Sequence, residues 1–170
     1  MKRFLCLVSL LFLSFVLFAC NASPKEFSKG GITLTLNTSF KESSADNAQV
    51  YYLSRKAMFM GNRFDPNDYP PTCRYDKESP DMLADHLRND EYLQYDGKPA
   101  HYSVLETGND GTKFAWLYYD NTVNNVEYSY MLVTKISDDY FYVMNFGCLK
   151  KDFEDLSSDF MDYAKTIKVE

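Results

Sequence analysis

The chain has 170 residues and a mass of 19.7 kDa, which is room for one domain with its own core and excludes a large modular enzyme. Hydrophobic residues make up 45% and charged residues 25%, average values that exclude a disordered scaffold. The formal net charge is −6 and the pI is about 4.9. This acidic balance argues against a nucleic-acid partner, because binding to phosphates needs Lys and Arg.

Residues 1–19 have the pattern of a secretory signal peptide. Lys2 and Arg3 precede an apolar stretch that is shorter than the roughly 20 residues of a comfortable membrane span. The stretch ends in Leu-Phe-Ala-Cys at residues 17–20, which resembles the lipobox of bacterial lipoproteins, although the Phe departs from the small residue usual there. The resemblance implies cleavage before Cys20, a diacylglycerol on its thiol, and a lipid-anchored domain in the cell envelope, outside the cytoplasm. An ordinary signal peptide with a chance Cys and an uncleaved anchor are the alternatives.

Residues 20–31 are expected to form a flexible tether, because they are mostly small or polar, contain Gly30 and Gly31, and include one large apolar residue, Phe27. Loss of residues 1–19 removes two cations and no acids, so the remaining chain is more acidic. Such a domain gains nothing from anionic lipid. We therefore expect the acyl chains to do the anchoring and the domain, residues 32–170, to stand off the bilayer.

The first half of the domain predicts strands. Residues 32–36 alternate between apolar and β-favouring polar side chains, the period of a half-buried strand, and Phe40 is expected to return to the core. Residues 50–64 are rich in Tyr, Met and Phe and predict one long strand or two short strands broken near residues 54–56.

A helix follows a proline-rich segment. The prolines between residues 65 and 78 exclude a regular element there. Ser79 is a good N-cap and Pro80 suits the first helical position, so the sequence predicts a helix over residues 80–92.

The second half predicts an antiparallel meander and a final amphipathic helix. Apolar side chains recur at helical spacing over residues 151–168, with charged side chains on the other face. The expected strands cover residues 101–106, 113–119, 126–136 and 140–148, with turns at 107–111, 120–125 and 138–139. These elements give an α+β domain.

This order of elements resembles the Mog1/PsbP-like fold, including the DcrB and DUF1795 families of small bacterial lipoproteins. The matching features are the strand at residues 32–36 followed by Phe40, the long meander, and a last helix that closes with Thr166 and Ile167. The resemblance implies an antiparallel sheet of about five to seven strands with two helices packed on it, and a mostly non-enzymatic binding or accessory role. No functional residue of the family maps onto this chain.

The sequence predicts no catalytic centre, cofactor or metal site. His86 and His101 are the only histidines, and neither has the clustered His and Cys neighbours of a zinc site. The sequence also has no phosphate-binding Gly loop, nucleophile elbow or metalloprotease helix. We therefore expect the protein not to be an enzyme.

Tyrosines give the one candidate binding surface. Tyr51, Tyr52, Tyr118 and Tyr119 form adjacent pairs on predicted strands, and adjacent strand residues point to opposite faces of a sheet. One face then carries tyrosines beyond those that the core needs, which suits a recognition surface. Ordinary β-propensity, with hydroxyls reaching water, is the alternative explanation.

Cys73 and Cys148 are the thiols left after cleavage and lipidation. In an exported protein two remaining cysteines are more often paired than free, so we expect a disulfide that fixes the proline-rich segment to the sheet. A free Cys148 buried as a small apolar residue is the alternative.

These observations predict a membrane-anchored, non-enzymatic binding or accessory lipoprotein with an unidentified protein or peptide partner. Two alternatives stay open. One is an inhibitor or immunity-type protein that caps a basic toxin or enzyme, and the other is an envelope hydrolase with an unrecognised site.

Overall fold

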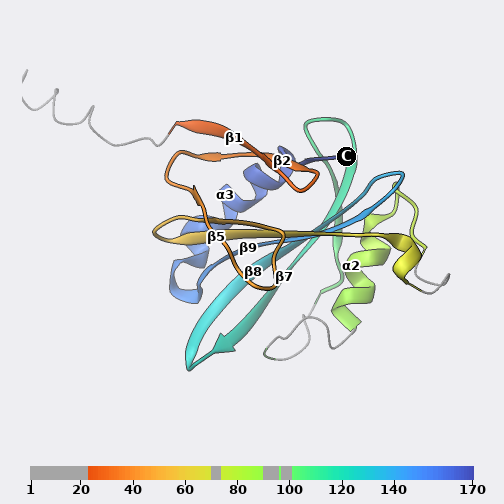
Figure 1. Ribbon diagram of the computed structural model, residues 1–170. Helices are drawn as coiled ribbons and strands as arrows, with labels where there is room; N and C mark the ends of the chain where they lie inside the picture. Colours follow the sequence, from red (N-terminus) through yellow and green to blue (C-terminus); the bar gives the residue numbers. More distant parts are fainter. Residues whose placement is uncertain (1–22, 70–73, 90–95, 97–100) are drawn as a thin grey trace, which may run out of the picture.

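The computed structural model describes residues 23–69, 74–89, 96 and 101–170. Over these residues the chain is an α+β domain with an antiparallel sheet of seven strands, a smaller antiparallel sheet of three strands, and two α-helices (Figure 1). The strands are β1 (Pro24–Lys29), β2 (Ile32–Asn37), β3 (Lys41–Glu42), β4 (Val50–Leu53), β5 (Ala57–Phe64), β6 (Val104–Thr107), β7 (Lys113–Val123), β8 (Val126–Ile136), β9 (Phe141–Leu149) and β10 (Lys168–Val169).

The large sheet has the order β3-β4-β5-β9-β8-β7-β6. Its central strand β9 is buried on both faces along nearly all of its length, because its sequence is apolar almost without interruption. β7 and β8 form a long hairpin whose turn residues, Asn124 and Asn125, have φ of 52° and 64°. Asn tolerates this left-handed conformation, which a tight two-residue hairpin requires.

The small sheet has the order β1-β2-β10, and over the described residues 23–31 it corrects the tether expected at residues 20–31. Six residues of β1 pair with β2, and the Phe27 ring lies 4.8 Å from the Tyr52 ring, centroid to centroid. Gly30 and Gly31, with φ of 61° and 77°, form the turn between the two strands. The glycines that suggested a linker therefore make a hairpin, because they permit the turn that lets β1 pair.

The two helices cover opposite faces of the large sheet (Figure 1). α2 (Pro80–Asn89) packs on β7 and β8, and a core that includes Leu83, Leu132 and Val143 lies beneath it. α3 (Phe153–Lys165) and the small sheet cover the other face, over a core that includes Phe146 and Phe160. Both cores share β8 and β9, because alternate residues of these strands point to opposite faces.

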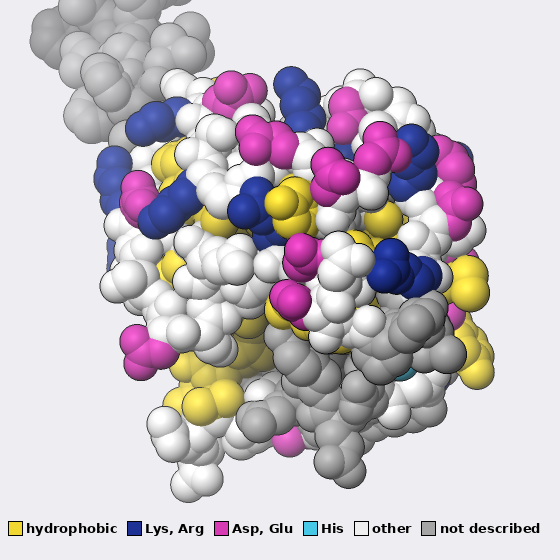
Figure 2. Space-filling model, turned by 45° about the vertical axis from the view of Figure 1, so that its right-hand side comes forward, with side chains coloured by type: hydrophobic (Ala, Val, Ile, Leu, Met, Phe, Trp, Pro, Cys, Tyr) yellow, Lys and Arg dark blue, Asp and Glu magenta, His cyan; other side chains and the backbone are white. Residues whose placement is uncertain are grey.

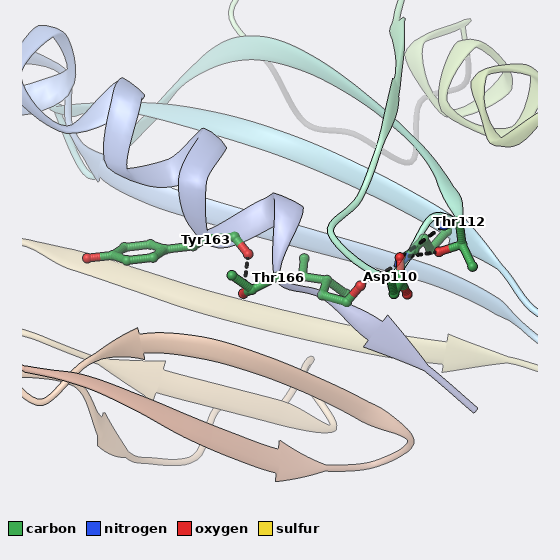
Figure 3. A network of polar contacts seen from close by, with 6 residues as sticks. Asp110, Thr112, Tyr163 and Thr166 are labelled. Carbon is green, nitrogen blue, oxygen red and sulfur yellow. Dashed lines mark hydrogen bonds and ion pairs between the residues drawn. The ribbon is translucent and has the colours of Figure 1, made fainter.

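A buried polar network joins the end of α3 to the large sheet (Figure 3). Lys135 has a side chain that is 1% exposed, lies 3.0 Å from a carboxylate oxygen of Asp110, and donates to the carbonyl of Ile167. Thr166 donates through Oγ1 to the carbonyl of Tyr163 at 2.7 Å. The Thr166 hydroxyl adds a second donor to the Tyr163 carbonyl, which also accepts from the Thr166 amide, and Lys135 holds Ile167, the second residue after the helix.

The two halves of residues 50–64, the strand at 126–136 and the final strand agree with their predicted positions. The expected strand at residues 101–106 begins later, at β6, and the expected turn at 120–125 shortens to two residues because β7 continues to Val123. The predicted helix over 80–92 is described as α2, and its last three residues lie outside the described part. The last helix ends before residue 168, because the segment after it pairs with β2 as β10.

Candidate binding groove on the open sheet face

Among the described residues, no helix packs on one half of the sheet face that carries α2. α2 packs on β6, β7 and β8, and beside it the side chains of β4, β5 and β9 line a groove of about 500 Å³ together with parts of β7 and β8. Met58, Met60 and Val143 give this groove apolar surface. Figure 2 shows hydrophobic side chains in a hollow at the lower left of the face in view.

Gly147 leaves room for two side chains that line the groove, Tyr130 and Met58. A Cβ atom at Gly147 would lie 2.7 Å from two carbons of the Tyr130 ring and 2.9 Å from the methyl carbon of Met58. A side chain at this position would therefore displace both neighbours. The Tyr130 ring also stacks on Tyr119, with a centroid separation of 5.0 Å and an interplanar angle of 16°.

A fixed amide lies among these aromatic side chains. Asn145 is 6% exposed, and its Oδ1 accepts a hydrogen bond from the Tyr119 hydroxyl at 2.9 Å. Among the described residues no partner is recorded for the Asn145 amide nitrogen, which can donate to a ligand in the groove. Burial, together with the neighbouring Tyr130, raises the pKa of Tyr119, so its hydroxyl stays protonated and holds the amide in this orientation.

The groove is neutral. Its lining is aromatic, apolar or amide-bearing, and none of the described residues that line it is charged, although a quarter of the whole chain is charged. The amides are Asn47, Asn62, Asn121 and Asn145. This lining can hold an uncharged ligand that offers apolar surface and hydrogen-bonding groups.

The structure brings together two of the four predicted tyrosines and separates the others. Tyr51 and Tyr119 line the groove. Tyr52 is 2% exposed and belongs to the core beneath the small sheet, whereas Tyr118 lies on that same face against Trp116 and Phe153. Adjacent strand residues point to opposite faces of the sheet, so Tyr52 and Tyr118 point away from the groove, and of the four tyrosines Tyr51 and Tyr119 are the ones that can contact a ligand there.

The sequence analysis did not single out the amides and methionines of the groove. Asn145 carried a usable signal, because Asn is depleted inside strands and this one lies within an otherwise apolar strand. Asn62 stands beside Arg63 at the polar end of β5 and carried a weaker signal. Their convergence depends on pairing between strands far apart in the chain, which local sequence patterns do not give.

The predicted cysteine sites have different outcomes. Cys148 is a free, buried thiol that points into the α3-side core, contrary to the expected bridge with Cys73. Cys148 pairs with Ala57 at the start of β5. The proline-rich segment begins after Phe64, at the other end of the same strand. Cys148 and the start of this segment therefore lie at opposite ends of β5. Burial, with a smaller effect of Asp152, raises the pKa of Cys148 to about 11. Cys73 and the proposed lipidation site Cys20 lie outside the described residues.

Metal binding and membrane insertion depend on further features of the described residues. Within the described ranges, no group of three or more His, Cys, Asp or Glu side chains is placed to hold a metal ion. No helix in the same part of the chain combines the length and apolar character that a membrane span needs.

No protein-family model and no curated protein matches this sequence. Solved structures match its shape. Cyanobacterial PsbP (CyanoP) from Synechocystis sp. PCC 6803 aligns with a TM-score of 0.60 at 12% identity, over 90% of this chain and 96% of its own. The chain has the Mog1/PsbP-like fold.

Two other structures share this Mog1/PsbP-like fold. LpqN of Mycobacterium tuberculosis, described as involved in cell envelope biogenesis, has a TM-score of 0.55 at 10% identity, over 89% of this chain and 87% of its own. The Ran-binding protein Mog1p of Saccharomyces cerevisiae has a TM-score of 0.52 at 12% identity, over 88% and 96%. The narrower assignment to the DcrB and DUF1795 families stays a prediction.

Proposed function

We propose that this protein is a non-enzymatic binding lipoprotein of a bacterial cell envelope, anchored through Cys20, and that its groove holds an uncharged segment of a peptide or protein. The observation that carries the proposal is the groove beside α2, where neutral aromatic, methionine and amide side chains surround the Asn145 amide nitrogen, a donor without a partner among the described residues.

The chemistry of the groove favours an extended polypeptide. Backbone carbonyls of such a segment would accept from the Asn145 amide, and its side chains would contact Met58 and Met60. Methionine adapts its shape to different apolar partners, and tyrosine gives large contact area at low entropic cost. A basic toxin would find no acidic side chain among the described residues of this groove, so the lining favours a neutral segment over that alternative.

Similar structures support the same function class. LpqN is involved in cell envelope biogenesis and Mog1p binds Ran, so this fold occurs both in the envelope and as a protein-binding module. The basic start and the Leu-Phe-Ala-Cys sequence at residues 17–20 support export and lipid anchoring. At this level of sequence identity the likeness establishes the fold alone. The kind of partner must therefore be inferred from the side chains of the groove.

An array of synthetic peptides with uncharged side chains, probed with the purified protein, tests the groove. Tyr51→Ala removes a groove wall and Asn121→Asp adds a charge there, so both variants are expected to lose at least about tenfold in affinity for any peptide that the wild type retains. Tyr118→Ala is the matched control, because Tyr118 is 36% exposed on the opposite face. Equal binding by all variants, or loss with Tyr118→Ala alone, would contradict the proposal.

A further inference from the structure

The described part of the domain begins at one corner of the fold, a few residues after the proposed lipidation site Cys20. The carbonyl of Ser23 accepts a hydrogen bond from the Thr38 amide at 2.9 Å, and β1 begins at the next residue. Two residues separate Ser23 from Cys20. Three Cα–Cα steps reach at most about 11 Å, so an acyl group on Cys20 holds this corner at the membrane surface.

Three segments meet at this corner, and we call them together the anchor corner: residues 23–25, residues 37–41 and residues 54–56. Pro24 pairs with Asn37 and Lys41 pairs with Leu53. Asn37 and Ser39 also border, with residues 54–56, a hollow of about 260 Å³. Figure 1 shows the start of β1 and the turn between β4 and β5 at the same side of the molecule.

The anchor corner is cationic although the whole chain is acidic. Lys25, Lys41, Arg55 and Lys56 are all exposed, and no ion pair is recorded for them within the described residues. The three segments themselves contain no Asp or Glu. Acids stand beside them, and Asp162 acts on Tyr163, which lines the hollow and bonds Asn37. Asp159 lines the hollow and Glu26 lies on β1, while Glu42 of β3 is paired with Lys29.

We propose that the anchor corner rests on the bilayer and that its four cations contact the headgroups of anionic phospholipids. The proposal rests on the lipid anchor of the proposed function, and it replaces the expectation that the domain stands off the membrane. Each Lys or Arg beside an anionic surface strengthens the contact about fivefold. Orientation by this corner lets an acidic protein approach such a surface, because most of its negative charge then faces away.

This orientation also places the groove. Met58 of the groove lies on β5, two residues after Lys56 of the anchor corner, which directly precedes that strand. A segment bound in the groove is therefore held close to the membrane surface.

The test uses the full-length protein purified from membranes and reconstituted into two kinds of vesicle, neutral phosphatidylcholine alone and the same lipid with about 30% phosphatidylglycerol. Hydrogen–deuterium exchange is measured for residues 38–42 and 53–57. We expect exchange in these segments to slow at least about fivefold in the anionic vesicles, and the protection to weaken in high salt because exposed charges are screened.

Charge variants identify the surface. Arg55→Glu with Lys56→Glu removes two cations of the anchor corner and is expected to abolish the protection. Lys113→Glu with Lys168→Glu makes the same change in net charge and is expected to keep it, because Lys168 pairs with Thr33 at the other end of β2 and Lys113 lies at the start of β7. If the variant with Arg55→Glu and Lys56→Glu does not fold, the variant with Arg55→Gln and Lys56→Gln replaces it. We expect this second variant to weaken the contact with anionic lipid about 25-fold.

Mass spectrometry of the same preparation keeps the two proposals apart. An unmodified Cys20 would contradict the lipid anchor of the proposed function. An acylated Cys20 with equal exchange in both vesicles, or equal loss of protection in the Lys113/Lys168 variant, would overturn the membrane contact of the anchor corner while the anchor itself stands.

Discussion

At the scale of single residues, burial decides which chemistry a side chain keeps, and Cys148 is a clear instance. Burial raises the pKa of its thiol to about 11, so almost none of the reactive thiolate exists at pH 8. We expect Cys148 to resist alkylation in the folded protein and to react once denaturant exposes it, as peptide mapping by mass spectrometry will show. Rapid modification of this residue in the native protein would contradict its place in the core.

Lys135 and Asp110 form the second case. Burial acts to raise the pKa of Asp110, but hydrogen bonds from Thr112 and Lys135 outweigh it and hold the pKa below the usual 3.8. The folded state therefore binds this proton less readily than the unfolded chain does, so the stabilisation is present above pH 3.8 and is lost as the pH falls below it. Burial lowers the pKa of Lys135, and Asp110 partly offsets that effect.

Asp110→Asn leaves the Lys135 charge buried without its partner. We expect a loss of about 1–3 kcal/mol at pH 7, less than for a fully buried pair because the Asp110 side chain is 20% exposed. The difference from wild type should shrink as the pH falls below 3.8, measured by denaturant unfolding at several pH values. Asp138→Asn is the control, because Asp138 is 81% exposed beside Lys77 and such pairs contribute little. A difference that stays constant down to pH 2 would contradict the assignment.

At the scale of elements, β1 turns a presumed linker into part of the fold. A chain that begins at Ile32 should be less stable than one that begins at Ser23 by about 1–3 kcal/mol, because it loses the half-buried Phe27 and the ladder to β2. Chemical denaturation of both chains measures this difference.

Two point variants separate the causes of that loss. Phe27→Ser should account for a large part of it, and Glu26→Ala, on the exposed face of β1, should change little. Equal stability of the two chain lengths would return residues 24–29 to the role of a tether.

The elements that the sequence predicted well are those with a strong local signal. The strand at residues 126–136 agrees at both ends, because polar turns bound a long run of β-favouring residues. β1 and β10 were missed for a physical reason. Both are short and largely polar, and they become strands by pairing with β2, which for β10 lies more than 130 residues away in the chain. The groove has the same origin, since its amides converge only when β5, β7 and β9 are side by side.

At the scale of the whole molecule, one sheet separates two cores, and we expect these cores to fold and unfold together. Met131 and Val133 of β8 point into the α3-side core, whereas Leu132 points under α2. β9 alternates in the same way. A disturbance on either face therefore acts on strands that both faces share, and the domain should unfold as a single cooperative unit.

Substitutions on the two faces test that unity. Phe160 is fully buried on the α3 side and Leu83 is 5% exposed under α2, so Phe160→Ala should cost about 3–5 kcal/mol and Leu83→Ala about 2–5 kcal/mol. The only tryptophan, Trp116, packs on the α3-side core, and its fluorescence should follow the same transition as far-ultraviolet circular dichroism in both variants. Ser158→Ala, on the exposed side of α3, should leave the midpoint nearly unchanged. If Leu83→Ala lowers the dichroism transition and leaves the Trp116 transition in place, α2 and its core unfold as a separate unit.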